Sequence, residues 1–145
     1  MSSAVTNNVL NHLLILHTRS LPMYLSFAPP YCLRGEERAR EALQHIVADH
    51  KAMVDRLGNM ILDNNGTIQH GEYPMWFTGL NDLSYAYVVQ QMIDLQKRDI
   101  AVIEDCLAQP ELDPMARALA EEALGAAKGH LESLQELTWE TSATP

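Results

Sequence analysis

Long stretches with helical periodicity constrain this chain more than any other feature. Apolar residues recur at spacings of three and four, and only residues 73–78 form a short aromatic patch. Residues that favour turns lie between these stretches. Four helices are therefore predicted, at about residues 4–27, 36–64, 80–108 and 114–139. A chain of 145 residues can bury one core, so we predict a single all-α domain over residues 1–145.

The connections between the helices predict their topology. Each of the two middle helices would be about 40 Å long at ~1.5 Å per residue. Residues 65–79 can span about 50 Å when extended, which is enough to cross the whole bundle. The other two connections are shorter and suit helical hairpins. Two hairpins joined by one long crossover form the ferritin-like four-helix bundle, and an up-and-down bundle with a compact link is the alternative.

Net charge, apolar run length and cysteine spacing limit the binding partners, the cellular location and the redox state that we expect. Nineteen acidic residues against ten basic ones give a net charge of -9, the wrong sign for binding nucleic acid or anionic lipid. No apolar run approaches the ~20 residues that span a bilayer, and residues 13–16 are too short for a signal-peptide core. We expect a cytoplasmic protein. Cys32 and Cys106 have no CxxC spacing and are expected to be reduced.

Three histidines lie on the apolar lines of three different predicted helices. His17, His50 and His130 are each placed to point into the core and to meet there. A single such residue is usually a hydrogen-bonded core residue, but leaving buried polar groups unsatisfied costs about 1 to 3 kcal/mol each. Three imidazoles suit zinc, iron, copper or nickel. His12 and His45 are turned away from these lines and are expected to be exposed.

The first helix resembles that of the bacterioferritin branch of the ferritin-like superfamily. The similarity is carried by Asn-His-Leu-Leu-Ile-Leu-His at residues 11–17 and continues to Tyr24, with a weaker likeness through all four helices. That family builds a di-iron centre from a Glu on helix one, ExxH on helix two, a Glu on helix three and ExxH on helix four. The family's haem-ligating methionine would fall on Ala48, so no haem is expected.

At several of the family's ligand positions, this sequence has a different residue from the one the family uses. His17 takes the place of the first Glu, and the two ExxH motifs become residues 47–50 and 127–130, which keep His50 and His130 but neither Glu. On the third helix, Asp94 matches the missing Glu by level and Asp99 fits the apolar line better. Three neutral imidazoles and one aspartate cannot balance the charge of two irons.

One transition metal ion is therefore the predicted cofactor, and its identity is left open among zinc, iron and nickel. Its ligands would be His17, His50 and His130, with Asp94 or Asp99 as a fourth ligand or as a partner that orients an imidazole. No substrate is indicated, and whether the protein is an enzyme is left open.

Two other functions are compatible with the sequence. The chain can be a metal-free degenerate bundle with a structural or assembly role, or an atypical di-iron oxidase. A homo-oligomer, dimer or larger, is expected. The aromatic residues 73–77 are a candidate partner surface because such clusters favour interfaces. They can equally cover one end of the bundle.

Overall fold

The computed structural model describes the backbone of residues 2–143 and the side chains of residues 4–80 and 83–137. Within that part of the chain the regular structure is entirely helical, as predicted. None of its helices is both long and apolar enough to cross a membrane. The elements are α1 (Ser2–Thr18), α2 (Leu21–Phe27), α3 (Glu37–Asp63), the 3-10 helix η1 (Met75–Asp82), α4 (Tyr85–Leu107) and α5 (Pro114–Ala143).

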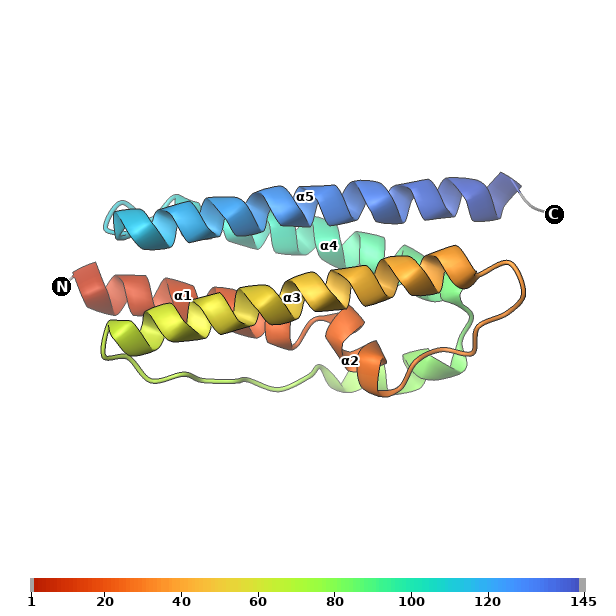
Figure 1. Ribbon diagram of the computed structural model, residues 1–145, viewed down its shortest axis with the longest axis horizontal. Coiled ribbons are helices and arrows are strands. Elements are labelled where there is room, and N and C mark those ends of the chain that lie inside the picture. Colours follow the sequence, from red (N-terminus) through yellow and green to blue (C-terminus); the bar gives the residue numbers. More distant parts are fainter. Residues whose placement is uncertain (1, 144–145) are drawn as a thin grey trace.

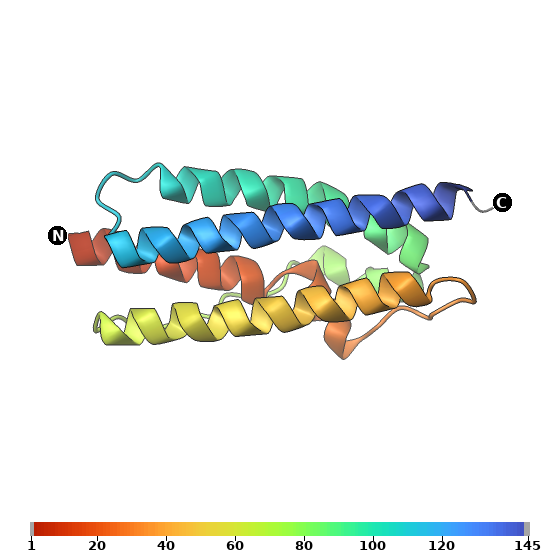
Figure 2. The ribbon, with the colours of Figure 1, turned by 45° about the horizontal axis from the view of Figure 1, so that its top comes forward.

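Four long helices lie side by side along the molecule (Figure 1). Helix α1 packs against α3, and α4 packs against α5, each pair running in opposite directions. After α3 the chain returns along the bundle through an extended segment and η1, so that α3 and α4 run in the same direction (Figure 2). The molecule thus contains two antiparallel hairpins joined by one long crossover.

The predicted first helix, residues 4–27, is two helices rather than one kinked helix. Helix α1 ends at Thr18, and the Ser20 hydroxyl accepts a hydrogen bond from the Met23 amide at 3.4 Å, capping α2. Pro22 lies in the first turn of α2, where its missing N–H costs nothing. The serine and proline therefore start a new helix, and Ser20 is left buried beside the core.

The end of α3 agrees with the predicted left-handed cap. Asn65 has φ of 61°, and the Gly66 amide donates to the Ile61 carbonyl at 2.8 Å, which closes the helix terminus. Helix α5 begins at Pro114 as predicted, with the Asp113 carboxylate accepting from the Met115 amide at 3.2 Å. It continues past residue 139 to Ala143.

The third long helix begins later than predicted. Residues 75–82 form η1, and α4 starts only at Tyr85, where the Ser84 hydroxyl accepts from the Tyr87 amide at 3.4 Å. In the aromatic segment before α4, residues 73–78, some side chains are buried and others are exposed. Phe77 is buried against Tyr24, with 5.7 Å between ring centroids, whereas Met75 and Trp76 are exposed. Part of this segment covers α2 and part of it faces outward.

The core consists of two apolar clusters at opposite ends of the bundle. The cluster near the start of α1 contains Leu10, Leu13, Leu14, Leu57, Ile61, Ile103, Leu119 and their neighbours. The cluster near α2 and η1 contains Leu21, Leu25, Leu43, Ile46, Phe77, Val88, Met92, Leu134 and their neighbours. In every long helix a polar residue separates the two clusters along the chain: His17, His50, Gln96 and His130. We call this level the histidine layer.

Candidate metal centre

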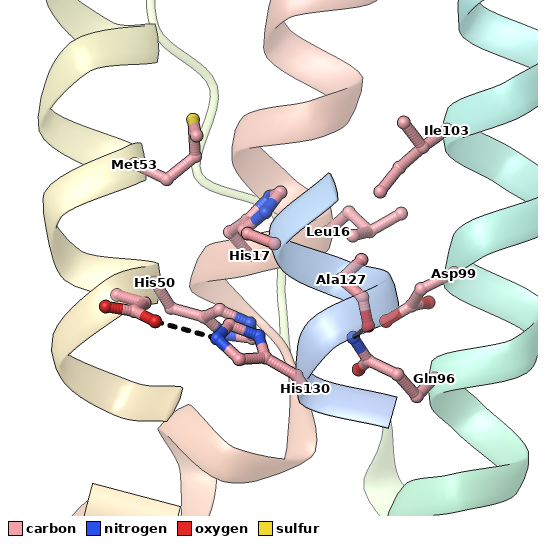
Figure 3. A pocket seen from close by; sticks show the side chains of 11 residues that line it. Leu16, His17, His50, Met53, Gln96, Asp99, Ile103, Ala127 and His130 are labelled. Atoms are coloured by element: carbon pink, nitrogen blue, oxygen red, sulfur yellow. Dashed lines mark hydrogen bonds and ion pairs between the residues drawn. The ribbon is translucent and has the colours of Figure 1, made fainter. Parts of the chain in front are cut away.

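The structure brings His17, His50 and His130 together in the middle of the bundle. They come from α1, α3 and α5, and each is no more than 6% exposed. Ring centroids are 5.0 Å apart for His17 and His50, and 5.7 Å apart for His50 and His130. Figure 3 shows the three side chains beside a small cavity of about 30 Å³. Eleven residues line it: Leu16, His17, Asp49, His50, Met53, Gln96, Asp99, Ile103, Ala126, Ala127 and His130.

Two of the imidazoles are fixed by partners in α1 and at the N-cap of α2. Nδ1 of His17 donates to the Leu13 carbonyl at 2.7 Å, so its Nε2 carries the lone pair in the neutral ring. Nδ1 of His50 lies 2.9 Å from the hydroxyl of Ser20, the residue that caps α2. The break between α1 and α2 therefore also supplies a hydrogen-bond partner to this site.

The third imidazole is fixed by a carboxylate. Nε2 of His130 donates to Oδ2 of Asp49 at 2.8 Å, and His45 lies on the outer side of the same oxygen at 3.5 Å. The other nitrogen of His130, Nδ1, is buried and has no hydrogen-bond partner. An unsatisfied group of this kind normally costs about 1 to 3 kcal/mol, so it marks a position where a ligand would be favourable.

Burial keeps two of the rings uncharged. Desolvation lowers the pKa of His17, and this effect outweighs the hydrogen bond to the Leu13 carbonyl, which raises it. The pKa of His50 is lowered well below its usual 6.5 by burial first and then by the neighbouring His17 and His130. Both imidazoles are therefore neutral at pH 7 and available as lone-pair donors.

Of the two aspartates predicted from α4, only one lines the cavity. Asp99 does so, and burial raises the pKa of its carboxyl to about 7. Asp94 is exposed and does not line it. Between these two residues, Gln96 is buried, and its Nε2 donates to the Ala127 carbonyl at 3.0 Å. This hydrogen bond ties α4 to α5 at the histidine layer.

Asp49 and Met53 also line the cavity, although neither was among the predicted site residues. Asp49 directly precedes His50 and lies at the interface with α5, which sequence spacing alone does not reveal. Met53 follows His50 by three residues and therefore lies on the same face of α3. Residues 47–50, predicted as the altered ExxH motif, contribute only their last two residues to the cavity. In α3, the two cavity-lining residues that are three positions apart, as Glu and His are in ExxH, are His50 and Met53.

In this conformation, the described side chains include no group of three or more His, Cys, Asp or Glu arranged to hold a metal ion. Binding would therefore require the side chains around the cavity to close on the ion. The chain matches no known family model, and no curated protein or solved structure resembles it closely enough to assign a relative. The resemblance to bacterioferritins therefore stays a hypothesis.

Proposed function

We propose that this protein is a ferritin-like bundle that binds one transition metal ion in the histidine layer. The ligands would be His17, His50 and His130, with Asp99 as a fourth ligand or as a balancing charge. The observation that carries the proposal is the buried Nδ1 of His130, which lacks a partner while Asp49 holds the opposite nitrogen.

The hydrogen bonds around the rings fit metal ligation. Histidine ligands usually donate their second nitrogen to a carbonyl or carboxylate, which fixes the ring and increases its basicity. His17 and His130 both do this, through Leu13 and Asp49. Because burial lowers the pKa of His17 and His50, an ion would displace no proton from either ring at pH 7.

Asp99 and the cavity size favour one ion over two. A nearby cation would stabilise the ionised form of Asp99, whose pKa burial raises to about 7. A volume of about 30 Å³ accommodates roughly one water or one ion. With a single carboxyl besides the hydrogen-bonded Asp49, the site offers little support for a di-iron oxidase. A bound ion with an open position would supply Lewis-acid or redox chemistry.

Metal analysis of the freshly purified protein tests the proposal directly. We expect close to one transition metal ion per chain and a melting temperature that falls on chelation. His50→Ala should abolish binding, whereas His12→Ala, at an exposed position on α1, should leave it unchanged. Metal-free protein that also takes up no added Zn²⁺, Co²⁺, Ni²⁺ or, under reducing conditions, Cu⁺ would contradict the proposal.

A metal-free bundle with a structural or assembly role is the competing function. It is favoured by the protein partners that His17 and His50 already have and by the exposed Met75 and Trp76 on η1. In that case the protein should be a dimer or larger oligomer whose melting temperature is indifferent to chelators. Because a homo-oligomer is expected for both functions, the melting temperature with and without chelator is the measurement that separates them.

A further inference from the structure

One side chain that lines the cavity, Met53, contains sulfur and is a potential metal ligand in addition to the three imidazoles. Met53 is 8% exposed and lines the cavity together with His17 and His50. It lies one turn beyond His50 on the same side of α3 (Figure 3). In that view its sulfur is turned away from the rings, but three rotatable bonds allow a methionine side chain to redirect its sulfur.

Met53 can also be described as ordinary core packing, because it belongs to the apolar cluster near the start of α1. Its position in that cluster is at the edge that meets the histidine layer. Leu57, one turn further along α3, is fully buried in the cluster and does not line the cavity. Met53 is therefore the residue of this cluster on α3 that an ion in the cavity could reach.

We propose that the ion of the histidine layer is Cu⁺, bound by the three imidazoles and the Sδ of Met53. This inference rests on the proposed function and names the metal for the same site. Imidazole and thioether are both ligands of copper, and thioether sulfur selects Cu⁺ over harder ions. Zinc in proteins is held by thiolate, imidazole and carboxylate ligands instead.

The charge of the cavity supports a monovalent ion. The three imidazoles and the thioether are neutral ligands, and Asp99 is the carboxyl that lines the cavity without a hydrogen-bonded imidazole. One carboxylate balances one positive charge, whereas a divalent ion would leave net charge in a buried site. Asp49 lies further out, with its side chain 44% exposed, and solvent screens its charge.

Competition titrations with a chromogenic Cu⁺ chelator, under anaerobic and reducing conditions, test this assignment. We expect the wild-type protein to bind one Cu⁺, and Met53→Leu, of similar volume, to weaken Cu⁺ binding by about tenfold or more. Zn²⁺ binding should not change in this variant. Met92→Leu is the matched control, because Met92 is also buried, in the other cluster, and does not line the cavity.

X-ray absorption of the Cu⁺-loaded wild-type protein gives a second readout that needs no variant, and we expect one sulfur neighbour of copper. Three results would overturn the assignment: Cu⁺ binding unchanged in Met53→Leu, equal loss of Cu⁺ and Zn²⁺ binding, or copper with no sulfur neighbour. Wild-type protein that binds Zn²⁺ but not Cu⁺ would overturn it too and leave the proposed function standing. Protein that binds none of Cu⁺, Zn²⁺, Co²⁺ and Ni²⁺ would overturn both.

Discussion

The histidine layer and the apolar cluster near the start of α1 are built from the same long helices but differ in how many polar side chains they bury. In the cluster near the start of α1, the buried side chains are mostly leucine, isoleucine and alanine, with Val9, Met53 and Cys106. Among the described side chains, the buried polar ones are Thr6, His17, Ser20, His50, Gln96 and His130. All of these except Thr6 line the cavity or hydrogen-bond to a residue that does.

The concentration of buried polar side chains in the histidine layer indicates that this layer contributes less to stability than an apolar layer would. Apolar side chains of similar volume would stabilise the bundle at least as well as buried polar groups do. Leu13 and Leu14, one turn from His17, and Leu57, two turns from His50, show that the same helices can pack an apolar layer. The polar groups of the histidine layer therefore call for an explanation other than folding, and a bound ion supplies one.

The largest effect is expected in the apolar cluster. Leu57 is fully buried there, so Leu57→Ala should lower the free energy of unfolding by about 2 to 5 kcal/mol through lost burial and a residual cavity. Denaturant unfolding measures this change. Leu62→Ala, at an exposed position on α3, is the control and should have little effect. Equal losses at the two positions would contradict the assignment of the core.

The sequence was sufficient to predict the helices and the meeting of three histidines. Apolar spacing along each segment fixes which face turns inward, so the lines through Leu13 and Leu57 led directly to His17 and His50. The sequence also predicted a helix cap correctly: Asp113 caps the helix that begins at Pro114. The split at Ser20 was missed because a proline in a long apolar stretch predicts a kink and a new helix start about equally well.

The surroundings of the histidines were less predictable because they depend on tertiary contacts. Which aspartate of α4 lines the cavity is set by how α4 rotates against α5, and the mixed pattern around Asp94 and Asp99 does not fix that rotation. Asp49 is bound to His130 across the helix interface, a pairing between residues far apart in sequence. Met53 had a local signal, its spacing from His50, but that spacing equally suits core packing.

Asp99 provides a test in which one substitution has opposite effects on stability and on binding. Burial raises the pKa of this carboxyl from 3.8 to about 7. Between these pH values the folded protein keeps a proton that the unfolded chain has lost, so stability falls as the pH rises through this range. Asp99→Asn removes the ionisable group and should raise the free energy of unfolding of metal-free protein at pH 8 by about 1 to 3 kcal/mol.

The same variant should bind metal more weakly, because the balancing charge is lost. Denaturant unfolding at pH 8 and near pH 4, where no stability gain is expected, measures the first effect, and metal titration measures the second. Asp94→Asn is the matched control on the exposed face of α4 and should change neither. A destabilised Asp99→Asn at pH 8 would show that the carboxyl is already paired within the protein.

His50 should produce a smaller dependence on pH with the opposite sign. Its pKa is lowered well below 6.5 in the folded protein. As the pH falls below 6.5, the unfolded chain takes up a proton that the folded chain does not, so stability is lost by at most about 1.4 kcal/mol per pH unit. His50→Leu should remove this loss.

The measurement for His50 is the difference in unfolding free energy between variant and wild type from pH 7 to pH 5. Taking this difference cancels the contribution of Asp99, and we expect it to shift in favour of His50→Leu as the pH falls. His12→Leu, at an exposed position, controls for the general effect of losing a histidine. A difference that is flat with pH would mean that the pKa of His50 is the same in the folded and the unfolded chain.

Thr6 gives the smallest effect and the most direct test of whether the two regions are separate. It is 1% exposed, and its hydroxyl accepts a hydrogen bond from the Asp113 amide at 3.0 Å, joining α1 to the start of α5. Thr6→Val keeps the shape but removes this acceptor and should cost about 1 kcal/mol. Thr6→Ser, which keeps the hydroxyl, should retain most of the hydrogen bond's contribution. Because Thr6 lies away from the cavity, metal affinity should be unchanged in both variants, and a loss of affinity in Thr6→Val would show that the apolar end of the bundle helps to shape the histidine layer.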